Sequence, residues 1–247
     1  MKNFCLDIGN TRAKTAIFDQ QKLEHFQYYD TEDALILPQK LDSIIYAKVK
    51  TLPQHWYEAI QKYQQKYPNT KIITLDARTP IPIHNRYKTP HTLGTDRLAA
   101  AVGAYALYPQ KNTLIIDAGT CITYDFIDQK GQFWGGNISL GLQMRAKALH
   151  QFTEKLPEIT INTNSPPHNL IGTYTEEALI NGIVGGILAE IETTIQQYKA
   201  IFPNITIIIC GGDAFYLEKK IKSTIFALPN LILHGLNSIA HYNASLP

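Results

Sequence analysis

One short pattern, an aspartate two residues before a glycine, ends two apolar stretches of this chain. The first copy is Asp7–Thr11, which lies between two stretches that read as β-strands, and the second is Asp117–Thr120, in the same kind of setting. The copies are too far apart to be the repeat of a solenoid. The pattern therefore indicates two halves of similar build, each with a tight turn between strands.

The order of apolar stretches and turn signals predicts an α/β protein with two mixed sheets flanked by helices. In the first half we expect strands at 3–8, 13–18, 24–29, 43–49 and 71–75, and helices at 32–39, 53–67 and 94–108. In the second half we expect strands at 113–117, 121–127, 132–138, 205–210 and near Leu231, and helices at 142–152, 175–200, after 213 as far as Ser223, and from Leu236. The domains are expected to be 1–110 and 111–247.

Three further features concern the helices and the segments between them. Residues 76–93 and 156–171 carry several prolines and are expected to be irregular, which in a compact domain often marks a functional segment. Thr95 is expected to cap the helix 94–108, whose alanines predict close packing against a neighbour. The helix 175–200 carries three glycines, each costing roughly 1 kcal/mol, which predicts that another group approaches its backbone.

Composition narrows the classes of function. The net charge of +2 arises from 23 basic and 21 acidic residues without a basic block, so nucleic acid is not an expected partner and small molecules are. Three distant cysteines and eight histidines without ligand spacing argue against a disulfide framework and a zinc site. Asp7 interrupts the apolar start, and no run of apolar residues has the length of a membrane span, so a cytoplasmic protein is expected.

The two turns are suited to phosphate. Glycine between strands lets successive backbone N–H groups converge on one point, and such arrangements bind phosphate oxygens. Asp7 and Asp117 would repel a phosphate, unless a cation lies between them. One copy alone is more often an ordinary turn, but two copies in matched halves favour phosphate binding. The glycine patterns of the common P-loop and dinucleotide folds are absent.

Asp96 follows the proline-containing segment 76–93, at the expected start of a helix and beside Arg97. The plain interpretation is a helix cap and a surface ion pair, worth at most about 1 kcal/mol each. The functional interpretation makes Asp96 the acceptor of a proton from a substrate hydroxyl, with Arg97 orienting a phosphate.

Four motifs occur in the order typical of one enzyme family. They are Asp7–Thr11, Tyr87–Arg97, Asp117–Thr120 and Gly135–Ile138, and the matching region extends to about Gly182. With these motifs the chain resembles the type III pantothenate kinases, of the acetate and sugar kinase, Hsp70 and actin superfamily. The resemblance implies two duplicated ribonuclease H-like domains with the active site in the cleft between them.

The resemblance also implies roles for individual residues. ATP would be bound by Asp7, Ile8, Gly9, Asn10, Thr11, Arg12, Ala13, Lys14 and Thr120. The pantothenate pocket would comprise Tyr87, Gly94, Thr95, Asp96, Arg97 and Thr175, although neighbouring Thr173 leaves the last register open. Asp96 would accept the proton. Asp117 would bind a monovalent cation, K⁺ or NH₄⁺, and Asp7 would lie near Mg²⁺.

The activity implied by the resemblance is ATP-dependent phosphorylation of pantothenate to 4′-phosphopantothenate, the first step of coenzyme A biosynthesis, by a homodimer with the substrate site near its interface. The chain departs from the family at Leu140, where proline is usual, and at Cys121, where alanine is usual. Gly211–Gly212 could approach adenosine or form a plain turn. Two alternatives remain open: a kinase of another small hydroxyl substrate, and a non-catalytic nucleotide-binding regulator.

Overall fold

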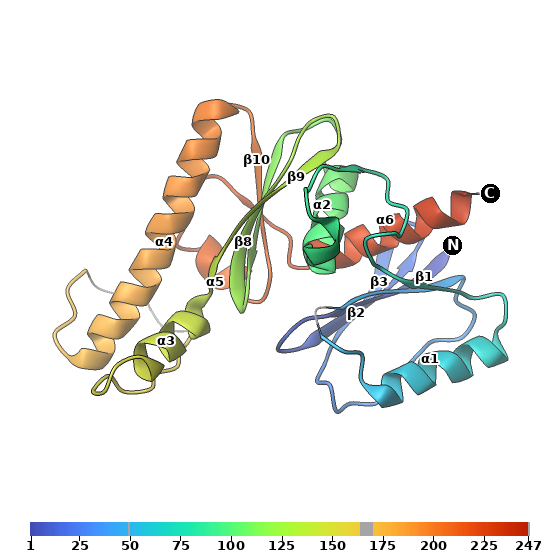
Figure 1. Ribbon diagram of the computed structural model, residues 1–247, viewed down its shortest axis with the longest axis horizontal. Coiled ribbons are helices and arrows are strands. Elements are labelled where there is room, and N and C mark those ends of the chain that lie inside the picture. The colour runs from blue at the N-terminus through green and yellow to red at the C-terminus, as the bar shows by residue number, and fades with distance from the viewer. Residues whose placement is uncertain (49, 164–169, 247) are drawn as a thin grey trace. The chain divides into compact units, whose positions relative to one another are not determined.

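The computed structural model describes residues 1–48, 50–163 and 170–246 (Figure 1). The chain forms two compact units. The first comprises Met1–Gln110, Gln129–Trp134 and Asn230–Pro247, and the second comprises Lys111–Asp128 and Gly135–Pro229. The predicted domains, 1–110 and 111–247, differ from these units in two segments. Residues 129–134 and 230–247 were expected in the second domain but belong to the first unit.

The first sheet has the strand order β3-β2-β1-β4-β5. Its strands are β1 (Lys2–Ile8), β2 (Ala13–Asp19), β3 (Lys22–Tyr29), β4 (Ser43–Lys48) and β5 (Lys71–Thr74). β1 to β3 form an antiparallel meander, while β4 and β5 run parallel to β1. The unit also contains α1 (Gln54–Lys66), β6 (His84–Asn85), the 3₁₀ turn η1 (Pro90–Thr92), α2 (Thr95–Leu107) and α6 (Leu231–Ser245).

The second sheet repeats this arrangement, with the order β11-β10-β7-β8-β9-β6. Its further strands are β7 (Thr113–Ala118), β8 (Cys121–Ile127), β9 (Gln132–Leu140), β10 (Thr206–Cys210) and β11 (Phe226–Ala227). Its helices are α3 (Leu142–Gln151), α4 (Thr175–Ile201) and the short α5 (Ala214–Glu218). Because β10 and β11 run parallel to β7 as β4 and β5 do to β1, the expected α/β fold of two similar mixed sheets is confirmed.

Some element predictions are wrong. Residues 32–39 form no helix; the segment is instead held against α1, where the Asp33 carbonyl accepts the Trp56 indole N–H at 2.6 Å and Leu35 belongs to the same buried cluster as Trp56. The strand expected near Leu231 is absent, since α6 begins there and β11 precedes it. The helix expected to reach Ser223 ends at Glu218, and the expected strand end at Val49 lies outside the described residues, as does 164–169 of the irregular segment.

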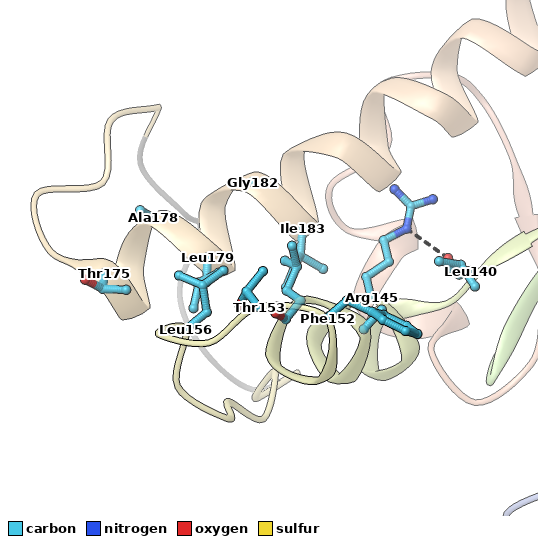
Figure 2. Close-up of a pocket in the computed structure, with 12 residues that line it drawn as sticks. Leu140, Arg145, Phe152, Thr153, Leu156, Thr175, Ala178, Leu179, Gly182 and Ile183 are labelled. Atoms are coloured by element: carbon cyan, nitrogen blue, oxygen red, sulfur yellow. Dashed lines mark hydrogen bonds between the residues drawn. The ribbon is translucent and has the colours of Figure 1, made fainter.

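In the second unit, α3 packs beside α4, and the two helices border a hollow of about 520 Å³ (Figure 2). Gly182 lines this hollow, and a Cβ added there would meet no atom within 4 Å. A Cβ at Gly186 would lie 3.5 Å from Arg145, which is ordinary contact. The close approach expected along this helix is therefore not seen at these two glycines, and Gly182 instead keeps the hollow open.

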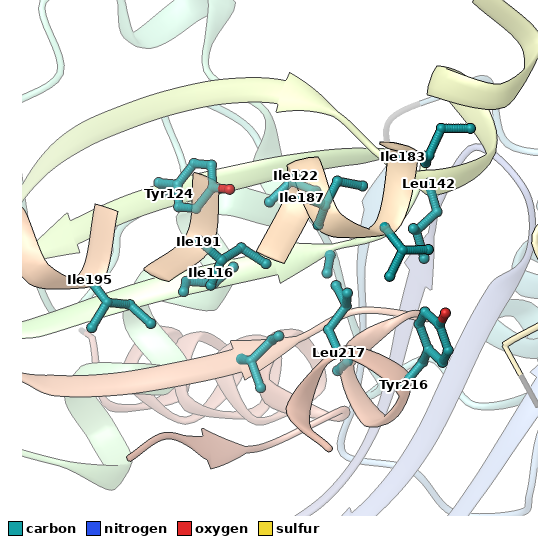
Figure 3. Close-up of a cluster of buried hydrophobic side chains, with 14 of the residues drawn as sticks. Ile116, Ile122, Tyr124, Leu142, Ile183, Ile187, Ile191, Ile195, Tyr216 and Leu217 are labelled. Carbon is teal, nitrogen blue, oxygen red and sulfur yellow. The ribbon is translucent and has the colours of Figure 1, made fainter. Parts of the chain in front are cut away.

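The core of the second unit is built on a row of isoleucines along α4 (Figure 3). Ile183, Ile187 and Ile191 are buried against the sheet, where they meet Ile116 of β7 and Ile122 of β8. Among the described residues, α4 is the one helix long and apolar enough to cross a membrane by length and composition. Its row of buried residues is the arrangement of a core helix.

In the first unit, the two faces of β1 meet different helices. Phe4 belongs to the same buried cluster as Trp56 of α1. On the opposite face, the Asn3 amide donates to the Asn237 carbonyl oxygen of α6 at 2.7 Å, and Cys5 is fully buried, which raises the pKa of its thiol. Since side chains alternate along a strand, Asn3, Cys5 and Asp7 share the face covered by α6.

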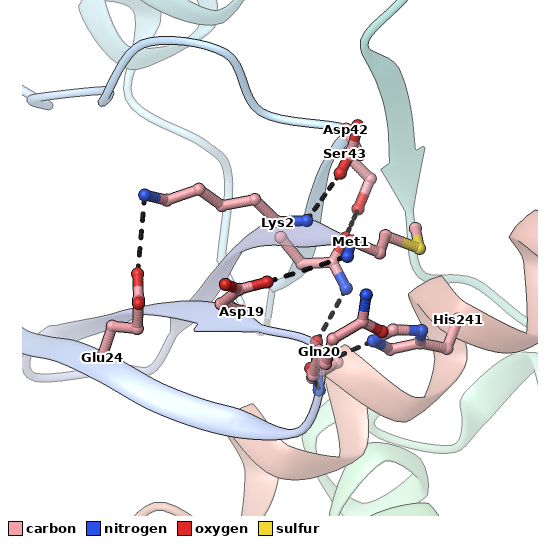
Figure 4. Close-up of polar contacts among 10 residues, drawn as sticks. Met1, Lys2, Asp19, Gln20, Glu24, Asp42, Ser43 and His241 are labelled. Carbon is pink, nitrogen blue, oxygen red and sulfur yellow. Dashed lines mark hydrogen bonds and ion pairs between the residues drawn. The ribbon is translucent and has the colours of Figure 1, made fainter.

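α6 lies with the first unit because it packs against α2 and β1, and polar contacts with the N-terminal strands add to this packing (Figure 4). Asn237 donates to the Gln20 carbonyl at 2.9 Å, and a ring nitrogen of His241 lies 3.1 Å from the same oxygen. α6 also crosses α2 closely, because a Cβ at Gly235 would lie 3.0 Å from the Gly103 nitrogen. The close packing expected of the alanine-rich helix is confirmed.

Candidate active site

The first turn follows directly from the end of β1. The Gly9 N–H donates to the Arg12 carbonyl at 3.2 Å, and a Cβ at Gly9 would lie 3.1 Å from that oxygen, so the turn is tight. Asp7 is only 6% exposed, whereas Asn10 to Arg12 are exposed. Of the other residues expected to bind ATP, Ile8 and Ala13 are buried in the core, and Gly9 and Lys14 are half-buried. Ile8 and Ala13 could thus reach a phosphate only through their backbone.

Asp96 lies at the same edge of the first sheet as this turn. Ile8 of β1 is paired with Lys48 of β4, and the Thr95 hydroxyl, at the start of α2, donates to the Lys48 carbonyl at 3.3 Å. Asp7 points to the face covered by α6, against which α2 packs. The structure therefore brings the first turn and the start of α2 together within one unit.

The Asp96 carboxylate is folded back over its own helix start. Its Oδ1 accepts the Arg97 N–H at 2.8 Å, and a Cβ at Gly94 would overlap the same oxygen, so a larger residue at position 94 would displace this carboxylate. Burial raises the pKa of Asp96, although the N–H and charge of Arg97 act in the opposite direction. The expected cap is wrong in one respect: Gly94 is the N-cap of α2, and Thr95 makes no side-chain capping bond.

Tyr87 and Arg97 form a pair beside Asp96. The Arg97 guanidinium carbon lies 5.7 Å from the centre of the Tyr87 ring, a cation–π arrangement, and Arg97 is only 6% exposed. The Tyr87 N–H donates to the Asn85 side chain at 3.0 Å. A buried cation beside a carboxylate of raised pKa is an arrangement that could hold an anionic substrate and accept its proton.

The second turn is held between β10 and α3. Gly211 has φ +93°, and a Cβ there would overlap the Asp117 carboxylate and the Ala118 carbonyl, so this position requires glycine. The Gly119 N–H donates to the Cys121 carbonyl at 2.9 Å, and a Cβ at Gly119 would meet nothing within 4 Å. One side of the turn is therefore open to a ligand.

Gly141 supports the turn from the other side. Its N–H donates to the carbonyl of the exposed Thr120 at 3.1 Å, and a Cβ at Gly141 would lie 2.6 Å from that oxygen. The hydrogen bond from Gly141 to Thr120 forms although Leu140 replaces the proline that the resemblance leads us to expect. Cys121 likewise takes part in the turn through its carbonyl.

Thr175, the remaining predicted substrate residue, belongs to the second unit, whereas Tyr87 and 94–97 belong to the first. It begins α4 and lines the hollow shown in Figure 2. Thr173 is engaged differently, because its N–H and hydroxyl donate to Glu177 at 2.7 and 2.9 Å. Of the two threonines, Thr175 is the one that lines the hollow.

Two charged residues near the turns were missed from the sequence. The Lys50 ammonium donates to the Asn10 carbonyl at 3.3 Å, which places a cation at the first turn. Asp213 donates its N–H to the Ala118 carbonyl at 3.0 Å, and burial raises the pKa of its carboxyl to about 6. The sequence signal for both residues was their position just after β4 and β10. These strands lie parallel to the strands that carry the turns, so their ends meet the turns.

Within 1–48, 50–163 and 170–246, no three His, Cys, Asp or Glu side chains gather as a metal site. Mg²⁺ in nucleotide sites is commonly held by one or two carboxylates together with substrate phosphates. Asp7, at the first turn, offers one such carboxylate. The chemistry of Asp7 therefore fits a divalent metal that arrives with ATP.

Comparison with known proteins agrees with the geometry. Residues 3–197 match the family described as Type III pantothenate kinase. The chain is 42% identical over 246 residues to the Type III pantothenate kinase of Bacteroides fragilis ATCC 25285, covering 98% of each chain. It is 42% identical to that of Phocaeicola vulgatus, covering 99% of this chain and 100% of the relative, and 40% identical to that of Christiangramia forsetii, covering 98% of each.

Two solved structures share the fold. A Campylobacter jejuni protein described as a Baf family transcriptional activator has a TM-score of 0.59 at 22% identity, covering 98% of this chain and 100% of that one. A Listeria monocytogenes protein described as an N-acetylmannosamine kinase has a TM-score of 0.53 at 11% identity, covering 99% and 100%. With full-length relatives of one description and a matching family profile, this chain belongs to the type III pantothenate kinase family.

Proposed function

We propose that this protein transfers the γ-phosphoryl group of ATP to the primary hydroxyl of pantothenate, forming 4′-phosphopantothenate for coenzyme A synthesis. The observation that carries the proposal is the full-length identity of 42% to relatives named for this activity. The position of Asp96 and Arg97 at the same sheet edge as the turn Asp7–Thr11 supports it.

Asp96 is proposed as the proton acceptor. As the hydroxyl oxygen bonds to the γ-phosphorus, the bond from phosphorus to the bridging oxygen breaks, ADP leaves with the electron pair, and the proton passes to the Asp96 carboxylate. Its raised pKa makes this carboxylate a better proton acceptor than an exposed aspartate. The buried Arg97 would hold the substrate or its phosphate by charge.

The two turns are proposed to hold ATP. The residues Asp7 to Lys14 would bind phosphates through the tight backbone turn, and Thr120 would contact them from the open second turn. Asp7 would hold Mg²⁺, which neutralises charge on the phosphate oxygens when bound. Asp117 would hold K⁺ or NH₄⁺, a cation that offsets the repulsion between its carboxylate and the nucleotide.

The direct test of substrate and reaction is ADP release measured with ATP and a panel of acceptors. The expected result is ADP formation that requires pantothenate and gives one phosphopantothenate for each ADP. Turnover with a sugar or another small alcohol in place of pantothenate would mean a different kinase. Nucleotide binding without turnover on any acceptor would mean a non-catalytic regulator.

A homodimer in the cytoplasm is also proposed, without nucleic acid or membrane partners. The resemblance supports this proposal. The surface around the hollow between α3 and α4 also supports the dimer. Phe152 is 81% exposed, Tyr174 64% and Leu140 45%, and exposed apolar groups of this kind are typical of protein interfaces. Thr175 lies among them, so a substrate contact by Thr175 would place the substrate near the dimer interface.

Replacing Phe152 with glutamate should convert the dimer to a monomer, because a charge would then be buried in an apolar contact. Sedimentation equilibrium measures the change in mass. Phe215→Glu is the matched control, since Phe215 is 56% exposed but does not line the hollow, and it should leave the dimer intact. A wild-type protein that is monomeric at high concentration, or a Phe152→Glu protein that stays dimeric, contradicts the proposed interface.

A further inference from the structure

A polar cluster in the second unit has no part in the mechanism described so far. Glu190 of α4 accepts the hydroxyl of Tyr124 at 2.7 Å and that of Ser139 at 3.1 Å, and it forms an ion pair with Arg145 of α3. Burial raises the pKa of Glu190, but hydrogen bonds from its three partners outweigh burial, and the pKa lies below its usual value. Glu190 is therefore ionised at neutral pH and faces a cation.

Arg145 connects this cluster to the support of the second turn. Its Nε donates to the Leu140 carbonyl at 2.9 Å (Figure 2), and an Nη donates to the Ser139 hydroxyl at 3.2 Å. The next residue, Gly141, is the one whose N–H donates to the Thr120 carbonyl. The planar guanidinium fixes several acceptors at once, so the position of Leu140 depends on Arg145, and that of Arg145 on Glu190.

The space around Gly141 leaves little tolerance for movement. A Cβ there would overlap the Gly119 carbonyl and would lie 2.6 Å from the Thr120 carbonyl. The backbone at the start of α3 is therefore in direct contact with the backbone of the second turn. A shift of Leu140 would be passed to Thr120, because packed backbone segments move together.

We propose that Glu190 and Arg145 are positioning residues for the turn Asp117–Thr120, and that they set its geometry for the phosphates of ATP. Neither is proposed to touch the nucleotide. The inference rests on the proposed function, because it requires that this turn binds ATP. It adds a contact from Glu190, a half-buried residue in the middle of α4, whose buried residues are hydrophobic.

The test is the dissociation constant for a non-hydrolysable ATP analogue with Mg²⁺, measured by titration calorimetry on the full chain. Glu190→Gln should weaken binding by about 10- to 100-fold, the scale seen when an outer partner that orients a binding group is removed. Arg145→Gln should have a similar effect, and the double variant should be no worse than either, because both act through one contact. The KM for pantothenate should change much less than the KM for ATP.

Glu192→Gln is the matched control. Glu192 lies on the same helix and accepts the Ser223 hydroxyl at 2.7 Å and the Ser223 N–H at 3.1 Å, and Ser223 is neither in the turn nor among the residues proposed to support it. It should lower the melting temperature without changing nucleotide affinity. If Glu190→Gln does not fold, Arg145→Lys is the second variant. Lysine keeps the charge but lacks the planar guanidinium that donates to several acceptors, so nucleotide binding should weaken to the same extent.

Two results overturn the inference. Wild-type affinity in a folded Glu190→Gln or Arg145→Lys protein, or equal losses in Glu190→Gln and Glu192→Gln, would reduce the cluster to a structural role. Failure of the wild type to bind the analogue would also overturn it. In contrast, a wild type that binds the analogue but does not phosphorylate pantothenate leaves this inference intact and refutes the substrate assignment.

Discussion

Asp96→Asn should fold normally and lose turnover by about 10²- to 10⁴-fold, the usual contribution of a general base. Asparagine keeps the size of the side chain and can still accept the Arg97 N–H, but it cannot take up the proton of the hydroxyl. The loss should appear in kcat, with the KM for ATP nearly unchanged. Steady-state kinetics with pantothenate and ATP gives both values.

The stability of the same variant separates a catalytic loss from a folding defect. Burial raises the pKa of Asp96 above its value in the unfolded chain, so its contribution to stability is present at low pH and is lost as pH rises through the folded-state pKa. At neutral pH, Asp96→Asn should therefore be at least as stable as the wild type. The wild-type rate should fall as pH drops through the raised pKa.

Asp19→Asn is the control for this prediction. The Asp19 carboxylate is 57% exposed and pairs only loosely with the N-terminal amino group at 3.8 Å. Its replacement should leave kcat unchanged. Near-normal turnover in a folded Asp96→Asn protein would remove the proton-acceptor role from Asp96.

Gly211→Ala should lower kcat/KM for ATP by about 10²-fold, the effect of misplacing a reacting group by ~1 Å. The new methyl group would overlap the Asp117 carboxylate and the Ala118 carbonyl, so the second turn must move. The positive φ of +93° adds strain of about 1–3 kcal/mol, which should also lower the melting temperature. Because Asp117 is displaced, the proposed activation by K⁺ over Na⁺ should be lost as well.

Gly212→Ala is the neighbouring control, since a Cβ at Gly212 would meet nothing within 4 Å. It should keep wild-type kinetics and wild-type response to K⁺. Equal rates of the wild-type protein in K⁺ and Na⁺ would count against the cation at Asp117. A Gly211→Ala protein with wild-type kcat/KM would show that the turn does not position ATP.

The local parts of this fold could be predicted from the sequence. Asp7–Thr11 and Asp117–Thr120 were recognisable because each follows an apolar strand and contains a glycine, and turn chemistry of this kind depends on neighbouring residues alone. The start of α2 at Gly94–Asp96 was also predictable, within one residue of its cap.

Features that depend on distant contacts were not predictable. α6 lies in the first unit because it packs against α2 and β1, which are distant from it in the sequence, and the Asn3–Asn237 hydrogen bond joins opposite ends of the chain. Residues 32–39 are held against α1 by Leu35 and by the Trp56 hydrogen bond to Asp33, contacts between residues that are distant in the sequence. The raised pKa of Asp213 is a consequence of burial, which its sequence neighbours do not reveal.

The central claim is that Asp96 receives the proton of the pantothenate hydroxyl. A crystal structure of the protein with pantothenate and a non-hydrolysable ATP analogue tests it most directly. The account predicts a carboxylate oxygen of Asp96 at roughly 2.6–3.2 Å from the primary hydroxyl, with the γ-phosphate on the other side of that oxygen. Pantothenate bound away from Asp96, with another group in contact with its hydroxyl, would contradict the account.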